Sequence, residues 1–309
     1  MRPLTCLGLL LGLWTAPGSA SPQQPTQPPP VVSARTDLVT LTVSVVDRRG
    51  GFVTGLRPER FTVYDSGDPQ PIQIFTSEDV PATIGLVIDS SGSMRGRREQ
   101  VTAAAAAFAD MSHPLDEFFT LNFNEYVWLG LPPGVAFTED MDELDAALSS
   151  APTDGMTALY DAVDRALDHL QLGRRDRKAL IVVSDGGDNA SAQTLEGVLE
   201  HARRTGALIY AVTLDNRDDS DANPRVLKKL AGETGARTFT PRSADEVMRA
   251  FAQIARDVRS AYTIGFVPTA TPDAGFRPLR VVVDAGDRRG LTVRTRAGYY
   301  AGPSAGQVR

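Results

Sequence analysis

The hydrophobic period of this chain changes twice along its length, and these changes limit the folds open to it. From residue 38 to residue 75, apolar and polar residues alternate, which predicts half-buried antiparallel strands. From 82 to 258, apolar runs of strand length alternate with amphipathic helical stretches. This second pattern predicts βαβ units around a mostly parallel, doubly wound sheet with helices on both faces. After residue 260 the period of two returns.

The central segment therefore has an α/β pattern with identifiable elements. A turn separates each apolar run from the helical stretch that follows it. The predicted helices are 101–111, 157–172, 193–204 and 244–258, and the predicted strands are 82–88, 118–123, 179–184 and 207–212, with an antiparallel edge strand at 126–131.

Neither β-rich end is long enough to bury a core of its own, since each has only about 40 residues. Together they offer about six or seven strands, enough for a small antiparallel β-sandwich. We therefore expect an α/β domain, residues 78–258, to be inserted into a sandwich built from 36–77 and 259–301.

The N-terminus has the features of a secretory signal peptide over residues 1–20. Arg2 is followed by an apolar run over 4–14, and Gly18-Ser19-Ala20 fits a cleavage site. A Pro-rich spacer, 21–35, and a tail, 302–309, complete the predicted organisation. The protein is thus predicted to be secreted or periplasmic.

Composition narrows the range of partners. The length of 309 residues suggests about two domains, and the net charge of −6 argues against nucleic acid as a partner. The only cysteine, Cys6, lies in the signal segment, so the mature chain would have neither thiol nor disulfide. No other segment is apolar enough to span a membrane, and the oligomeric state is left open.

The run Asp89-Ser90-Ser91-Gly92-Ser93 lies between a predicted buried strand and a predicted helix. This places it at the carboxyl end of a parallel strand, where open α/β sheets bind ligands. One carboxylate and two hydroxyls, spaced by two residues each, offer only oxygen ligands. Such a set favours a hard divalent cation such as Mg²⁺.

This D-x-S-x-S spacing resembles the metal-ion-dependent adhesion site of von Willebrand factor type A (vWA) domains. Two further segments fit the same family, 154–161 around Thr157 and 180–189 around Asp185. The resemblance implies that Ser91 and Ser93 bind the metal directly and that Asp89 and Asp185 act partly through water. It also implies that Thr157 joins when a ligand is bound. Mg²⁺ is the expected ion, with Mn²⁺ and Ca²⁺ as alternatives.

The flanking segments resemble an exported vWA-related bacterial family that is frequent in Acidobacteria. The residues that carry this resemblance are Gly55-Leu56, the stretch 61–67 and the closing run 296–300. It extends the similarity over nearly the whole mature chain.

The charge count of the site predicts how it would act. Two carboxylates only neutralise a divalent cation, so coordination positions remain for water or for an incoming anion. We therefore expect a non-catalytic adhesion or scaffold module that binds a partner protein through an exposed Asp or Glu.

Two alternatives stay open. One is a structural envelope protein with a vestigial metal site. The other is Mg²⁺-dependent phosphoryl transfer with Asp89 as nucleophile, although Ser91 stands where such enzymes usually have a second Asp. His113, His169 and His201 lie outside any recognisable catalytic motif.

Several polar or charged residues near the motifs have two interpretations. Asn124, Glu125, Asp154 and Asp188 would either support the metal site and its partner or cap loops and helices. The three arginines at 95, 97 and 98 would either attract an acidic partner or form a solvated helix start, and 174–178 predicts an exposed loop.

Overall fold

The computed structural model describes residues 38–149, 152–214, 221–269, 275–284, 286 and 290–301. The predicted signal peptide, spacer and C-terminal tail lie outside the described residues. Within the described part of the chain, no helix combines the length and apolarity needed to cross a bilayer.

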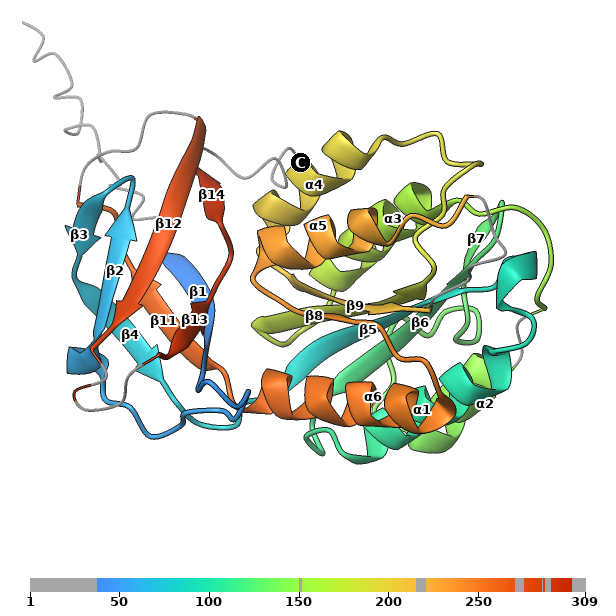
Figure 1. Ribbon diagram of the computed structural model, residues 1–309, viewed down its shortest axis with the longest axis horizontal. Coiled ribbons are helices and arrows are strands. Elements are labelled where there is room, and N and C mark those ends of the chain that lie inside the picture. Colours follow the sequence, from blue (N-terminus) through green and yellow to red (C-terminus); the bar gives the residue numbers. More distant parts are fainter. Residues whose placement is uncertain are drawn as a thin grey trace, which may run out of the picture. The chain divides into compact units, whose positions relative to one another are not determined.

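A six-stranded sheet forms the centre of the α/β domain (Figure 1). Its order is β10-β9-β8-β5-β6-β7, and all neighbours are parallel except β6 and β7. The prediction of a mostly parallel sheet with an antiparallel edge strand is confirmed. The strands are β5 (Ala82–Asp89), β6 (Glu117–Phe123), β7 (Val127–Leu129), β8 (Arg177–Ser184), β9 (Leu208–Thr213) and β10 (Thr238–Phe239).

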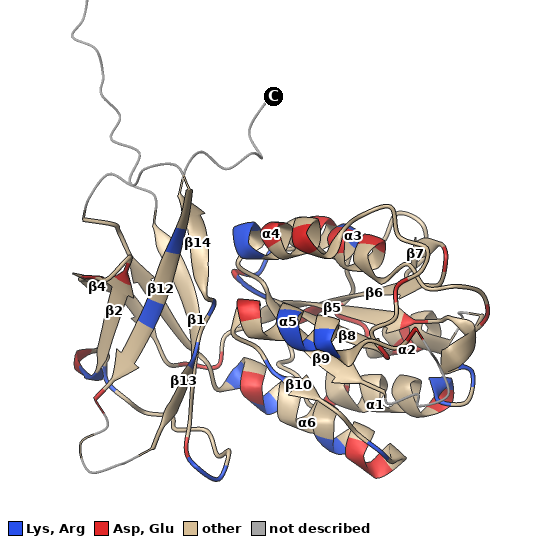
Figure 2. Cartoon of the chain, turned by 45° about the horizontal axis from the view of Figure 1, so that its top comes forward, with Lys and Arg blue, Asp and Glu red and all other residues tan. Residues whose placement is uncertain are grey.

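Helices cover both faces of this sheet (Figure 1). On one face, Phe108 and Phe251 meet in an edge-on ring contact above the strands. On the other face, a second cluster packs against Phe119 and Leu180. The first face carries α1 (Arg98–Asp110), α2 (Met141–Ser149) and α6 (Ala244–Arg259), and the second carries α3 (Leu159–Gln171), α4 (Leu195–Thr205) and α5 (Pro224–Thr234). Charged residues lie mainly on the helices and loops (Figure 2).

Both ends of the chain build the predicted β-sandwich. One antiparallel sheet has the order β13-β1-β11-β4 and the other β14-β12-β2-β3. Leu41 of β1 lies opposite Ile264 of β11, and Val63 of β2 lies opposite Val281 of β12. The strands are β1 (Val39–Val46), β2 (Phe61–Asp65), β3 (Asp68–Gln70), β4 (Ile72–Thr76), β11 (Tyr262–Phe266), β12 (Gly275–Val283), β13 (Thr292–Arg294) and β14 (Gly298–Ala301).

The two sheets share one core. Leu41, Val63, Ile264 and Val281 all belong to a single buried apolar cluster. Tyr262 lies in the same cluster, and its hydroxyl donates to the Val53 carbonyl at 2.8 Å. Because strands from both ends fill this core, the inserted arrangement is confirmed; the exact domain boundaries stay a prediction.

Some elements escaped the sequence analysis. The short elements α2, β3, β10 and β14 were not predicted, because each offers few apolar repeats. The helix α5 was also missed, although Val226, Leu227 and Leu230 form a buried face at helical spacing. The helix α2 depends on a local cap, since Asp140 accepts the N–H groups of Asp142 and Glu143 at 2.9 and 3.3 Å.

The prediction of an exposed loop over 174–178 is wrong at its end. Arg177 and Lys178 belong to β8, and Arg177 is only 3% exposed. Its guanidinium donates to the carbonyls of Val258 and Ala261 at 2.7 and 3.0 Å, so the burial of the cation is offset by hydrogen bonds. The charge of Arg177 led to the prediction that it is exposed. The carbonyls that accept its hydrogen bonds are distant in sequence, so the local pattern gave no sign of its burial.

Candidate functional site

Asp89 is the last residue of β5, and its side chain is fully buried. Its Oδ1 accepts the Ser91 N–H at 2.9 Å, and its Oδ2 accepts the Ser184 hydroxyl at 2.7 Å. Burial raises the pKa of the Asp89 carboxyl to about 6, and the nearby negative charge of Asp185 acts in the same direction. These hydrogen bonds oppose that rise. A buried carboxylate held in this way favours an added positive charge.

The neighbouring strand β8 ends at Ser184, so Asp185 reaches the same edge of the sheet. The Ser93 hydroxyl donates to Asp185 Oδ2 at 3.0 Å, and the hydroxyls of Ser91 and Ser93 are 3.2 Å apart. A short 3₁₀ helix, Gly92–Met94, turns the chain between these residues and the start of α1. Four of the five predicted ligands thus lie in one hydrogen-bonded group.

The fifth predicted ligand, Thr157, is held in place by hydrogen bonds of its backbone. Its N–H donates to Asn189 Oδ1 at 2.9 Å, and its carbonyl accepts the Asn189 N–H at 2.9 Å. The loop that carries it also bonds to the motif loop, since the Gly92 N–H donates to the Gly155 carbonyl at 3.2 Å. Thr157 is 8% exposed. All three predicted segments therefore meet at one edge of the sheet, although among the described residues no hydrogen bond joins the Thr157 hydroxyl itself to the other four.

The predicted neighbours act as loop supports. Glu125 accepts the Met156 N–H at 3.0 Å, and Asn124 Nδ2 donates to the Asp154 carbonyl at 3.0 Å. Asp188 accepts the Tyr160 N–H at the start of α3 at 2.9 Å. These contacts favour the interpretation as loop and helix caps.

Two supporting residues were missed by the sequence analysis. Ser184 was read only as part of an apolar strand, although its position directly before Asp185 gave a signal. Arg98 does not form a solvated helix start: its Nη1 donates to the Ser90 hydroxyl, and its Nη2 donates to Asn122 Oδ1 at 3.0 Å. Arg98 therefore holds the motif loop in place through Ser90. Burial lowers the pKa of its guanidinium, and attraction to the Asp89 carboxylate opposes this shift.

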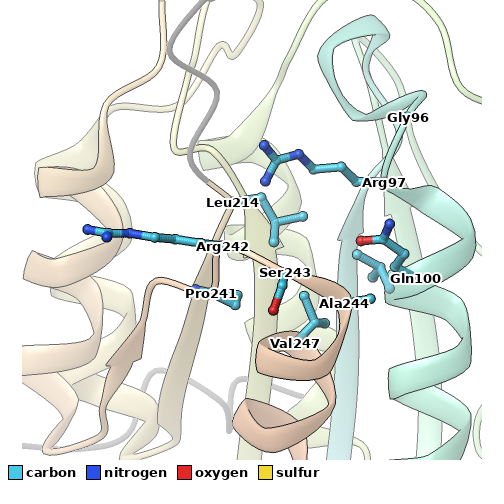
Figure 3. A pocket seen from close by; sticks show the side chains of 10 residues that line it. Gly96, Arg97, Gln100, Leu214, Pro241, Arg242, Ser243, Ala244 and Val247 are labelled. Carbon is cyan, nitrogen blue, oxygen red and sulfur yellow. The ribbon is translucent and has the colours of Figure 1, made fainter.

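A cavity of about 240 Å³ lies between the starts of α1 and α6. Figure 3 shows the Arg97 side chain reaching toward Leu214, whereas the Arg242 side chain points away from Leu214 on the other side. A second cavity of about 230 Å³ is lined by Asp185, Leu214 and Arg242. The surface beside the candidate ligands is therefore hollowed on the side of α6, and arginine side chains border it.

The donor set consists of two carboxylates and three hydroxyls, all oxygen. Among the described residues, no three His, Cys, Asp or Glu side chains form a metal-binding cluster. The buried Asp89, the proximity of Asp185 and the aligned hydroxyls fit a hard divalent cation that keeps some water. Metal binding by these residues stays a prediction.

Comparison with known protein families identifies the segment that carries the candidate ligands. Residues 84–187 match the family model described as von Willebrand factor type A domain. This chain contains a vWA domain. The match begins in β5 and ends just after Asp185, so it includes the Asp89 motif, Thr157 and Asp185. No curated protein matches the sequence.

Solved structures share the fold at low identity. A von Willebrand factor type A protein from Catenulispora acidiphila is 13% identical, covers 85% of this chain and 73% of its own, and has a TM-score of 0.51. Proximal thread matrix protein 1 from the mussel byssus is 14% identical, covers 63% and 51%, and also scores 0.51. The conserved hypothetical protein BatB from Bacteroides thetaiotaomicron is 15% identical, covers 58% and 100%, and scores 0.48. Because their identities are below 25%, the two structures with a TM-score of 0.51 show a shared fold and nothing more.

Proposed function

We propose that the vWA domain binds a divalent cation through Asp89, Ser91, Ser93, Thr157 and Asp185 and uses it to hold a partner protein. Mg²⁺ is the proposed ion, with Mn²⁺ and Ca²⁺ as alternatives. The partner would present an exposed Asp or Glu. The protein would act as an exported, non-catalytic adhesion or scaffold module, either secreted or periplasmic.

One observation carries this proposal: the oxygen atoms of Ser91, Ser93 and Asp185 form a hydrogen-bonded series beside the buried carboxylate of Asp89. In a site without cations these two carboxylates repel each other, and burial strengthens that repulsion. A divalent cation would remove the repulsion. This gain supports a binding role for the site rather than a merely structural one.

The bound cation would supply uncompensated charge and exchangeable coordination positions. Ser91 and Ser93 are already turned toward the Asp185 side of the site, so they would need little reordering. Thr157 stands on a separate loop and would reach the ion from across the motif. An anionic side chain would gain more there than a neutral one, since it approaches a cation that only two carboxylates balance.

Calorimetric titration of the full chain with Mg²⁺ and Mn²⁺ tests the metal site. Asp89→Ala should remove most of the metal binding, because it deletes the central buried carboxylate. Asp168→Ala is the matched control, since that side chain on α3 is 74% exposed. Equal metal affinity in wild type and Asp89→Ala would overturn the assignment.

The partner role needs a second experiment. Envelope extract is passed over immobilised wild type, Asp89→Ala or Asp168→Ala, with Mg²⁺ or with EDTA. A protein captured by wild type and Asp168→Ala only in Mg²⁺ supports the proposal. Capture that persists in EDTA would place the function on another surface. Metal binding without a captured partner, but with Mg²⁺-dependent hydrolysis of a phosphate ester, would favour phosphoryl transfer.

A further inference from the structure

Two large apolar side chains stand exposed beside the candidate metal site. Tyr126 is 71% exposed and Met156 is 53% exposed. Tyr126 follows the end of β6, and Met156 directly precedes the predicted ligand Thr157. A single exposed apolar residue is common, but tyrosine and methionine are enriched at protein interfaces, and here two of them flank one site.

The loops that carry them are held firmly together. The Ala158 N–H donates to the Asn124 carbonyl at 2.7 Å, and the Tyr126 N–H donates to Asn124 Oδ1 at 2.8 Å. Gly155 has a positive φ of 87°, and a Cβ there would lie 1.8 Å from Glu125 Oε2. The backbone is therefore fitted closely around the Glu125 carboxylate, and this fit fixes where Met156 emerges.

The fold does not require these two apolar side chains to be exposed to solvent at these positions. The backbone contacts use Asn124 and Glu125, whereas the side chains of Tyr126 and Met156 take no part in any of these bonds. A polar residue at either position would preserve the loop. Their presence therefore points to something outside this part of the chain.

We propose that Tyr126 and Met156 form an apolar contact surface for the residue next to the partner's acidic side chain. This inference rests on the proposed function, because it assumes that an Asp or Glu of the partner occupies the metal. The partner segment would then carry a bulky aliphatic or aromatic residue beside that acid. A second acid at this position is disfavoured, since Glu125 lies between the two loops.

The chemistry of the pair suits such a contact. Tyrosine offers a rigid amphipathic ring, and methionine has a flexible, polarizable side chain that adapts to different shapes. Covering both would bury apolar area directly beside the charged contact. Removal of water from that charge would also strengthen it.

The experiment uses a displayed library of peptides with a fixed central Asp and random flanking residues, selected on the full chain in Mg²⁺. The variants are Tyr126→Ser, Met156→Ser and the double variant. Leu172→Ser is the matched control, since Leu172 is 68% exposed at the end of α3, where the chain leads to the opposite edge of the sheet. Calorimetry with Mg²⁺ is run on every protein.

Wild type and Leu172→Ser should enrich bulky apolar residues next to the Asp by about fivefold or more. The double variant should lose this enrichment yet keep its Mg²⁺ affinity and its requirement for the Asp. An unchanged preference in the double variant, or no apolar preference in wild type, would overturn the inference while leaving the metal role intact. Peptide binding that persists in EDTA or in Asp89→Ala would instead refute the proposed function, and this inference with it.

Discussion

Ser184 donates a 2.7 Å hydrogen bond to Asp89, so the last residue of β8 orients the last residue of β5. The same hydroxyl accepts the Gly186 N–H at 3.0 Å. One buried serine thus joins the motif strand to the loop that follows Asp185. Ser184 therefore helps to set the relative position of the two carboxylates of the candidate site.

Replacement of this serine should weaken metal binding without removing a ligand. In Ser184→Ala the buried Asp89 Oδ2 loses its donor, so its carboxylate is less well fixed and harder to ionise. We expect Mg²⁺ affinity to fall by about 10- to 100-fold, as for other residues that orient metal ligands. Calorimetry measures this fall. Ser112→Ala, which removes a hydroxyl bonded to the Phe108 carbonyl of α1, is the control and should bind like wild type.

Metal affinity should depend on pH through Asp89. Its pKa is about 6 because the carboxyl is buried, and a cation must displace the proton below that value. Affinity should therefore rise by about tenfold per pH unit up to pH 6 and level off above it. Titrations at several pH values between 5 and 8 test this. A flat affinity across that range would show that the Asp89 carboxyl does not take part.

Stability without metal should respond to pH through a second buried carboxyl, Asp257 of α6. Burial raises its pKa to about 6, although Arg237, Arg294 and a hydrogen bond from Ser44 oppose the rise. Because the folded pKa lies above the unfolded value, this stabilising contribution is complete at low pH and is lost as pH rises to about 6.

Asp257→Asn should flatten that dependence. Since the amide carries no charge at any pH, the change in unfolding free energy between pH 4 and pH 7 should shrink by about 2 kcal/mol. Urea unfolding at both values measures the change. A variant with the wild-type pH profile would mean that another group titrates. EDTA is present throughout, so that Asp89 contributes equally in both proteins.

A side chain at Gly155 should disturb the loop beside the metal site. In Gly155→Ala the new Cβ would force the Glu125 carboxylate to move, and its hydrogen bond from the Met156 N–H would be lost. We expect metal-dependent partner binding to be lost, with a stability loss of about 1–3 kcal/mol. Binding assays and thermal unfolding together separate the two effects.

Gly134→Ala provides a close control for this variant. Gly134 has a φ of 88°, near the 87° of Gly155, but a Cβ there meets nothing within 4 Å. Both variants carry the same backbone strain, and only Gly155→Ala adds the collision. Equal binding by the two variants would mean that the position of this loop is unimportant.

Much of the architecture followed from the sequence, because hydrophobic period is a local property. The buried run 82–88 needs no distant information to be read as a strand, and it is β5. The order of strand, turn and helix around Asp89 likewise placed that carboxylate at a sheet edge. The short length of each β-rich end led to the prediction of a shared sandwich, and the pairing of β1 with β11 confirms it.

Local signals failed where a residue's role depends on distant backbone. Arg177 is charged and looked exposed, yet it is buried because two carbonyls near the end of α6 accept its hydrogen bonds. Arg98 was expected either to attract an acidic partner or to form a solvated helix start, yet it holds the motif loop. In both cases the partner lies more than a turn away in sequence, so no periodicity could indicate it.

The sequence by itself determined which segments become strands and helices and which residues can offer oxygen ligands, because side-chain size, charge and period are encoded residue by residue. Only the tertiary structure decided that Ser184 orients Asp89, that Glu125 fixes the Gly155 loop, and that Tyr126 and Met156 remain exposed beside Thr157. Those relationships depend on distances between loops that follow different strands. Such distances are set by how β5, β6 and β8 pair, and no single segment contains that information.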